Sequence, residues 1–292
     1  MADSASHTFG ELIGNFFEEA MKLPVSQIAK KYGLYFDSKG RRPARKTLKV
    51  TWLDVNGSKH DLDYVIEKNG SDDAIGRPIA FIELAWRRYT KHSKNKVQEI
   101  TAAITPIAQR YSECNPFKGA ILCGVFTEPS LMQLKGQGFC VLYIPYEKMV
   151  NVFKKHNVDI FYDEATEEEV FRNKIQQFEK ADLDAIKKDL LEYNKTEIDA
   201  FTGALEKVIQ RSIKSVYVLP LHGKAEILPS ADAAINYIDS YTEMPPGVTI
   251  QLYLIQISFN DGSEIKGEFK SKDLAKDFLR RINQLNSSAN FY

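Results

Sequence analysis

Two short segments of predicted β-strand contain the acidic residues that could carry chemistry in this chain. Asp63 stands in the run 59–68 and Glu83 in the run 79–86, and both runs are typical of β-strands. Hard cations such as Mg²⁺ bind carboxylate and carbonyl oxygens, and water and a substrate phosphate complete their shell. Asp63, Glu83 and the backbone carbonyl of Leu84 could supply such oxygens. This arrangement suits a metal ion that activates water for attack on a phosphate.

Basic residues lie close to these acids in the sequence. One group follows Glu83 directly, and an earlier loop, 39–46, holds the other. The two groups are Arg87, Arg88, Lys91, Lys94 and Lys96, and Arg41, Arg42, Arg45 and Lys46. A run of charges is usually a solvated surface, but beside a carboxylate in a buried strand it could contact nucleic-acid phosphates. A carboxylate in such a strand needs a metal or a cationic partner, because burying a lone charge is costly.

The surrounding sequence predicts a mixed α/β core that positions these residues. Apolar residues at helical spacing predict helices, and Asn56-Gly57 between two alternating runs predicts a hairpin. The expected elements are helices at 8–21 and 25–32, strands at 48–55, 59–68 and 79–86, a helix at 94–111, a strand–helix–strand unit at 119–144 and a helix at 147–156. The two strands of the last unit should be parallel, because a crossover helix joins them.

The rest of the chain divides into a helical segment and a smaller module. From 166 to 213 the pattern is helical and highly charged, which predicts a connector. Beyond it, a hairpin followed by a helix occurs twice, with Ser230 at the start of one helix and Ser271 at the start of the other. The second copy begins with a strand expected at 249–259. We therefore expect a core at 1–165, a connector at 166–213 and a β-β-α-β-β-α module at 214–292.

Residues 8–160 resemble the PD-(D/E)XK nuclease superfamily, which has the restriction-endonuclease-like fold. The superfamily pattern is an Asp on one strand of a hairpin, then a strand carrying Glu-x-Lys, then a helix. Asp63 matches the Asp, and Glu83-Leu84-Ala85 matches the tripeptide. Within the superfamily the chain looks most like the type II restriction endonucleases. In these the first helix often bears an acidic metal-site residue, which Glu18 or Glu19 could be here.

The resemblance implies an α/β (α+β) fold with a mixed sheet flanked by helices. It also implies hydrolysis of phosphodiester bonds in double-stranded DNA as part of a restriction system. Asp63, Glu83, Leu84 and Glu18 would hold Mg²⁺, for which Mn²⁺ can substitute. A homodimer would match the two-fold symmetry of a palindromic site, and the C-terminal module would serve specificity or dimerisation.

The chain departs from the superfamily pattern where Ala85 stands in place of the lysine. That lysine helps to position or deprotonate the attacking water. Superfamily members are known to move it onto the following helix, and Lys96 or Lys91 could take the role here. The alternative is a non-catalytic DNA- or protein-binding protein on a degenerate nuclease fold. A third reading, a protein–protein adaptor, would rest on the charged helices of 166–213.

Composition excludes several other classes of protein. The chain has 292 residues and a formal net charge of +0, so it is not a purely electrostatic, histone-like DNA binder. Its three cysteines show no CxxC or Cys/His ligand spacing, which argues against zinc and fits a reducing cytoplasm. No apolar run approaches the roughly 20 residues that cross a bilayer, so no membrane partner is expected.

Overall fold

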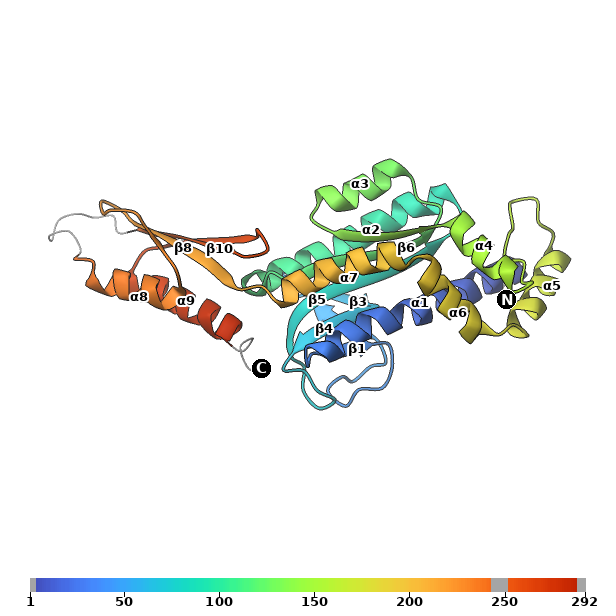
Figure 1. Cartoon of the computed structure of the whole chain (residues 1–292), viewed down its shortest axis with the longest axis horizontal. Helices are drawn as coiled ribbons and strands as arrows, with labels where there is room; N and C mark the ends of the chain where they lie inside the picture. Colours follow the sequence, from blue (N-terminus) through green and yellow to red (C-terminus); the bar gives the residue numbers. More distant parts are fainter. Residues whose placement is uncertain (1–3, 243–251, 288–292) are drawn as a thin grey trace. The chain divides into compact units, whose positions relative to one another are not determined.

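A computed structural model describes residues 4–242 and 252–287, which belong to two compact units. The first unit comprises the residues up to Ser112 together with Pro116–Glu206. The second comprises Glu113–Asn115 and the residues from Lys207 onward. Figure 1 labels the helices and strands of both units. No helix in the described ranges combines the length and the apolar character that crossing a membrane requires.

A five-stranded mixed sheet forms the centre of the first unit (Figure 1). Its strands, in the order β1-β4-β5-β6-β7, are Tyr35–Ser38, Tyr64–Lys68, Arg77–Arg87, Phe117–Gly124 and Cys140–Pro145. β1, β4 and β5 are antiparallel, whereas β5, β6 and β7 are parallel. The prediction of a parallel strand–helix–strand unit is therefore confirmed. The sequence pattern does not predict β1, whose four residues are too few to display a clear alternation.

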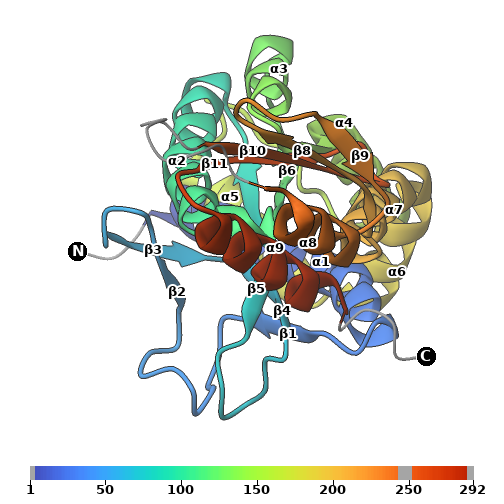
Figure 2. The same ribbon diagram turned by 90° about the vertical axis from the view of Figure 1, so that its left-hand side faces the viewer.

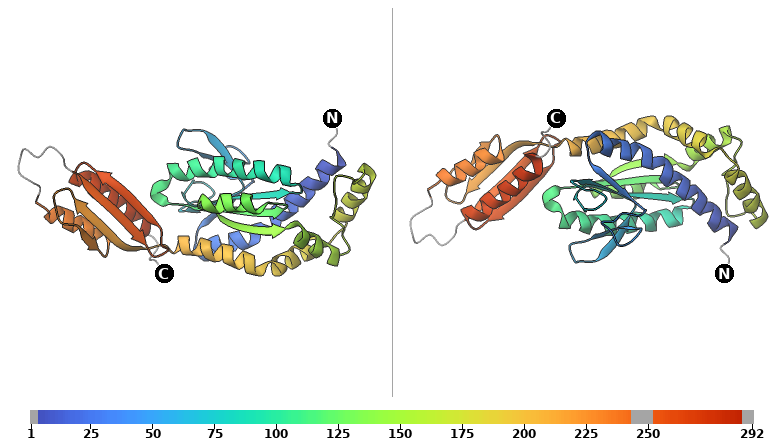
Figure 3. Two further views of the ribbon diagram at one scale, coloured as in Figure 1. Left: turned by 90° about the horizontal axis from the view of Figure 1, so that it is seen from above. Right: turned by 90° about the horizontal axis from the view of Figure 1, so that it is seen from below.

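Helices cover both faces of this sheet (Figure 3). They are α1 (Ala5–Lys31), α2 (Thr90–Arg110), α3 (Glu128–Gly136), α4 (Tyr146–Lys155), α5 (Glu168–Glu179), α6 (Leu183–Tyr193) and α7 (Lys195–Ile209), with a 3₁₀ helix at Ser112–Cys114. α2 and α3 pack on one face, where Val97 and Leu131 join Phe81 and Leu122 in a buried cluster. α1, α4 and α7 cover the other face. The fold class is thus the expected one, a mixed sheet flanked by helices.

α1 is one continuous helix, so the prediction of two helices at 8–21 and 25–32 is wrong. Pro24 lies inside the helix and removes one backbone N–H from its hydrogen bonding. The helix continues because its apolar face is buried before the proline, by Met21, and after it, by Val25. Tertiary packing here outweighs the local preference of proline.

The run predicted as one strand at 59–68 is broken at Asp63 into β3 (Lys59–Leu62) and β4. β3 pairs with β2 (Val50–Leu53) in a separate two-stranded sheet, seen in Figure 2, and this pairing confirms the hairpin. Gly57 in its turn has a φ of +83°, a left-handed conformation that glycine adopts readily. The break places Asp63 where the chain passes from the hairpin into the central sheet.

The segment predicted as a helical connector, 166–213, belongs mostly to the first unit. Phe178 of α5 stacks on Phe153 of α4 and meets Phe16 of α1 edge to face. Farther along, Ile186 and Leu205 are fully buried. The connector prediction is wrong because the charged pattern does not reveal what the apolar stripe of each helix contacts.

The second unit has the predicted β-β-α-β-β-α order. Its antiparallel sheet, β11-β10-β8-β9, consists of Glu264–Phe269, Tyr253–Phe259, Ile213–Pro220 and Glu226–Leu228. α8 (Ala231–Ser240) and α9 (Lys272–Ser287) bury Ala234 and Leu279 against Val218 and Ile255, so both helices lie on one face. Residues 249–251 of the strand predicted at 249–259 lie outside the described residues.

Candidate active site

Asp63 and Glu83 lie beside each other in the first unit. The Oδ2 atom of Asp63 accepts a hydrogen bond of 2.7 Å from the backbone N–H of Leu84. The Glu83 carboxylate in turn accepts a hydrogen bond from the backbone of Asp63. Because Tyr64 of β4 pairs with Ile82 of β5, the two acids occupy the next positions along the same ladder. The backbone thus brings both carboxyl groups to one place.

Glu83 faces α2, where Lys96 is its partner. Side chains alternate across a strand, so Glu83 shares the face of Phe81 and Ala85, which α2 covers. Glu83 is 6% exposed, and the Nζ atom of Lys96 lies 3.3 Å from its Oε2 atom. Lys96 therefore supplies the positive charge that accompanies this buried carboxylate.

Of the two lysines proposed to replace the missing motif lysine, Lys96 lies beside the acids and Lys91 does not. Ala85, at the place of the lysine in Glu-x-Lys, is 4% exposed and packs in the apolar cluster beneath α2. Lys96 brings its ammonium to the same acids from α2, as predicted. Lys91 and Lys94 are exposed and do not line the cleft beside the acids. The suggestion that Lys91 assists the attacking water therefore has no geometric support.

Burial and mutual repulsion make the acids of this site difficult to ionise. Burial, and then the charge of Asp63, raises the pKa of Glu83 to about 8, although Lys96 opposes the change. Burial also raises the pKa of Asp63. Burial followed by the Asp63 charge raises the pKa of Glu18, on α1. A cation among these carboxyl groups would favour their charged forms.

The acids adjoin a cleft of about 590 Å³ between α1 and the end of β5. Asp63, Leu84 and Lys96 line this cleft. Glu83 is not among the lining residues, but its carboxylate contacts Lys96, which is. Its polar and aromatic lining further includes His7, Glu11, Asn15 and Glu18 from α1, and Trp86, Arg87, Arg88, Tyr89 and Tyr162. A concave site with a few convergent polar groups is the usual form of a ligand-binding site.

The residues present fit Mg²⁺ or Mn²⁺ better than a metal that needs an all-protein shell. Within residues 4–242 and 252–287, no group of three or more His, Cys, Asp and Glu side chains is arranged to hold a metal ion. Mg²⁺ commonly takes one or two carboxylates and completes its octahedron with water and substrate oxygens. Asp63 and Leu84 line the cleft and Glu83 lies beside Asp63, so two carboxylates and one backbone carbonyl could supply such a set.

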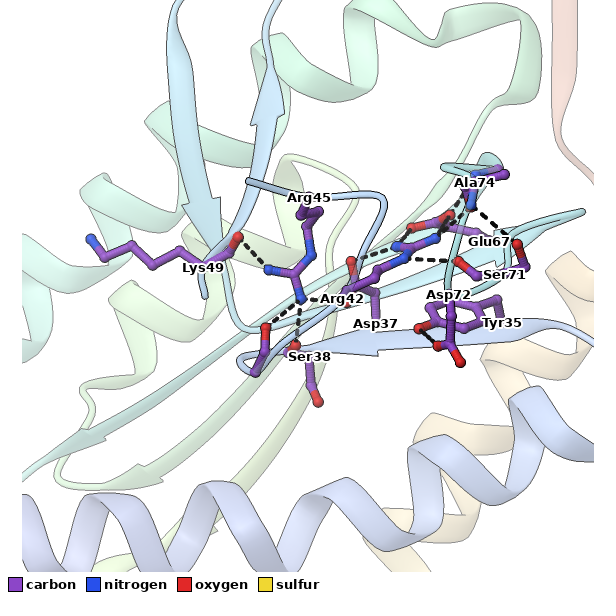
Figure 4. A network of polar contacts seen from close by, with 12 residues as sticks. Tyr35, Asp37, Ser38, Arg42, Arg45, Lys49, Glu67, Ser71, Asp72 and Ala74 are labelled. Atoms are coloured by element: carbon purple, nitrogen blue, oxygen red, sulfur yellow. Dashed lines mark hydrogen bonds and ion pairs between the residues drawn. The ribbon is translucent and has the colours of Figure 1, made fainter. Parts of the chain in front are cut away.

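Two arginines of the predicted phosphate-binding loop are internal (Figure 4). The guanidinium of Arg42, which is 3% exposed, binds Asp37 at 2.6 Å and Glu67 at 2.6 and 2.9 Å. Arg45 binds the other oxygen of Asp37 at 2.9 Å. Although burial opposes its charge, hydrogen bonds to Glu67 and Asp37 raise the pKa of Arg42 above its ordinary value.

Arg42 and Arg45 are therefore not available to contact phosphates, contrary to the prediction. That prediction is wrong for them because a basic loop looks the same in sequence whether its charges face solvent or a buried carboxylate. Arg41 and Lys46, from the same loop, are exposed and stay candidates.

The two arginines at the end of β5 donate hydrogen bonds to backbone carbonyls of the protein itself. Arg87 donates to the carbonyl of Trp86 at 2.8 Å, and Arg88 donates to the carbonyl of Tyr162 at 2.7 Å. The Arg88 guanidinium also lies 4.2 Å from the centre of the Tyr146 ring. Arg88 thus ties β5 to the segment after α4, while both arginines still line the cleft.

The site also contains residues that the sequence patterns do not single out. His7, Glu11 and Asn15 precede Glu18 at spacings of four, four and three residues, which places them on one face of α1. This periodicity is the signal that could identify them. Lys39 lies close enough for its charge to act on the pKa of Asp63 and of Glu18. Lys39 opens the basic loop 39–46, but the sequence does not place it at the site, because β1, which precedes it, is too short to predict.

No protein-family model matches the chain, and no curated protein matches it either. Among solved structures, the chain is similar to the crystal structure of a protein of unknown function, AF1548, with 10% sequence identity and a TM-score of 0.28. The match covers 64% of this chain and 99% of that one. At this TM-score the similarity carries no argument about fold or function.

Proposed function

We propose that this protein is a metal-dependent nuclease of the PD-(D/E)XK type that hydrolyses phosphodiester bonds in DNA. One observation carries the proposal, the convergence of Asp63, Glu83 and Lys96 beside one cleft. Glu83 is buried and Asp63 half-buried, the pKa values of both are raised, and the lysine lies 3.3 Å from Glu83. The three residues come from a hairpin strand end, the next strand and the following helix, which is the order of the superfamily pattern.

In this proposal the chain supplies the ligands and the groups that orient water. Asp63, Glu83 and the carbonyl of Leu84 hold Mg²⁺ or Mn²⁺, and Glu18 adds negative charge from α1. The bound cation would stabilise charge on the phosphate and lower the pKa of the attacking water. The ammonium of Lys96 favours the ionised form of Glu83 and would donate a hydrogen bond toward that water. Because both acids have raised pKa values, metal binding would release protons.

Within this class we propose a type II restriction endonuclease that acts as a homodimer on double-stranded DNA. A symmetric dimer presents one active site to each strand of a palindromic sequence. Arg41, Lys46, Arg87, Arg88 and Lys94 remain the cationic groups that would contact phosphates. The second unit would serve recognition or dimerisation.

The competing proposal is a DNA-binding protein that has kept the fold but lost the reaction. It is favoured by the fact that each acid already has a partner, Lys96 for Glu83 and the N–H of Leu84 for Asp63. On this proposal Mg²⁺ would neither bind in the cleft nor change the thermal stability of the protein.

The deciding experiment incubates plasmid and phage DNA with the full chain in Mg²⁺, in Mn²⁺ and in excess EDTA. The nuclease proposal expects cleavage in either metal and none in EDTA, together with metal-dependent stabilisation of the protein measured by thermal unfolding. DNA binding with no cleavage and no metal effect on unfolding would favour the competing proposal.

A further inference from the structure

A second, smaller cavity of about 200 Å³ adjoins the candidate active site. It shares two lining residues of α1, Asn15 and Glu18, with the larger cleft. Its other walls include Ser38 and Lys39, at the end of β1, and Tyr64 of β4. The two cavities therefore meet at Glu18, and a ligand that fills the cleft could continue into the smaller one.

Lys39 is the charged group of the smaller cavity that is left for a ligand. Lys22, the other lysine on its wall, lies 3.8 Å from Glu19 on the same helix. Lys39 is exposed and, among the residues that the structure describes, takes part in no ion pair. Lys39 lines the same cavity as Glu18, which also lines the main cleft together with Asp63.

The buried network of Figure 4 holds the backbone on both sides of Lys39. Arg45 donates to the carbonyl of Ser38 at 3.0 Å and to that of Gly40 at 3.2 Å. The same guanidinium binds Asp37, which Arg42 binds from the other side. Such a set of internal bonds fixes a loop that would otherwise move, so Lys39 is presented in a defined place.

We propose that the smaller cavity is a phosphate subsite, in which Lys39 and Ser38 hold the phosphate next to the scissile one on the same DNA strand. This inference rests on the proposed function. Consecutive phosphates of a strand lie close together, and the two cavities share Asn15 and Glu18, so a strand with one phosphate at Asp63 brings the next within reach of the smaller cavity. Contacts of this kind fix the register of the strand and carry no sequence information.

Glu18 stands between the two cavities and would repel an unaccompanied phosphate. The cation proposed for the main cleft would offset this repulsion. Binding in the subsite should therefore strengthen when the metal is present.

The test compares Lys39→Gln with a matched control, Lys59→Gln, in the full chain. Lys59 is also exposed, on β3, and does not line either cavity. Each protein is given an oligonucleotide whose cleavage position has been mapped, and variants of it in which the phosphate on the 5′ or the 3′ side of that position is a neutral methylphosphonate. Cleavage rates and equilibrium binding are both measured.

We expect Lys39→Gln to cleave the unmodified DNA about tenfold more slowly, and a methylphosphonate at one of the two positions to slow the wild type by a similar factor. The two losses should not add, because each removes the same contact. The control should behave as the wild type. Additive losses, or a Lys39→Gln protein equal to the control, would overturn the subsite.

The two proposals fail separately in this experiment. If the wild type binds DNA but never cleaves it, the nuclease proposal is wrong, and the subsite is then judged by binding alone: it is overturned if Lys39→Gln binds unmodified DNA as tightly as Lys59→Gln does. If the wild type binds no DNA under any condition, both are overturned.

Discussion

At the scale of the residue, a half-buried carboxyl group, that of Asp63, lies beside a buried one, that of Glu83. Asp63 and Glu83 are adjacent, and Lys96 contributes one positive charge to the pair. A second negative charge in a poorly solvated place destabilises the fold unless a proton or a further cation compensates it. The proposed metal ion would supply the compensating positive charge. Its effect on the free energy of unfolding can be measured without knowing the substrate.

Neutral replacement of either acid should abolish cleavage while sparing DNA binding. Asp63→Asn and Glu83→Gln keep the side-chain shape but remove the charge, and we expect losses of at least ~100-fold in rate, as for other groups that stabilise charge in a transition state. The control is Asp61→Asn, since Asp61 is exposed and pairs with Lys49 outside the cleft. Full cleavage by either buried variant would remove this site from consideration.

The pH dependence of stability should carry the signature of Glu83. Its pKa is raised from 4.5 to about 8 in the folded chain, so the folded state holds this proton more tightly than the unfolded state. The free energy of unfolding should therefore fall as pH rises from about 4.5 to about 8 in the absence of metal. Glu83→Gln should flatten this decline and be the more stable protein at pH 8.

Urea unfolding at several pH values, with and without Mg²⁺, measures the effect. Mg²⁺ should stabilise the wild type most at the high-pH end, where the acids must otherwise be charged alone, and should not stabilise Glu83→Gln to the same extent. A stability that rises across this interval without metal would contradict the assignment.

Lys96 should be the lysine that matters for the reaction. Lys96→Met removes the ammonium that neighbours Glu83, and we expect cleavage to fall by roughly 100-fold or more, the usual scale for a group that assists proton transfer. The pH at which activity appears should also rise, because the pKa of Glu83 loses a cation that lowers it. Lys91→Met, on an exposed turn of the same helix, is the control and should retain full activity.

At the scale of the element, the site depends on a chain break and on a buried ion network. The interruption between β3 and β4 lets Asp63 turn toward Leu84 instead of continuing a strand. The network around Arg42 fixes the loop that follows β1. Both features lie in the antiparallel part of the sheet, which therefore supplies one acid and the proposed phosphate contact.

Removing the Arg42 guanidinium should destabilise the first unit strongly. Arg42→Met leaves Glu67 and Asp37 buried with less positive charge, and breaking a buried pair in this way costs about 3–5 kcal/mol. Chemical denaturation would measure the loss, and Arg41→Ala, at the exposed neighbouring position, should change stability by less than about 0.5 kcal/mol. If the two variants were equally stable, the network would not support the fold as described.

At the scale of the whole molecule, the chain consists of two units with separate cores. α5 and α6 belong to the first unit, and only the end of α7 extends past the boundary at Glu206. The candidate site lies entirely within the first unit. The second unit should therefore be dispensable for metal binding.

A chain that ends after residue 211 keeps α7 complete and should still unfold cooperatively and be stabilised by Mg²⁺. We expect it to lose sequence-specific cleavage or dimer formation, which DNA digestion patterns and light scattering would report. Full site-specific cleavage by the shortened chain would assign the second unit to some other task.

The sequence by itself determined the features that depend on short stretches of chain. Asn56-Gly57 and the alternation around it predicted the hairpin, and the repeated hairpin–helix pattern predicted the second unit. Glu83 was identifiable because an acid within an apolar strand contrasts with its immediate neighbours, and Asp63 because it matches the Asp of the superfamily pattern. These patterns are local, and local sterics and burial of one face are enough to produce them.

Only the tertiary structure decided which charges meet. Lys96 and Arg42 are indistinguishable in sequence from the basic residues around them, yet one approaches Glu83 and the other is buried between Asp37 and Glu67. Packing of elements distant along the chain selects these partners. Packing also explains why α1 continues through Pro24 and why most of the charged segment α5–α7 belongs to the first unit. In both cases, burial of an apolar helix face against another element outweighs the local conformational preference of the sequence.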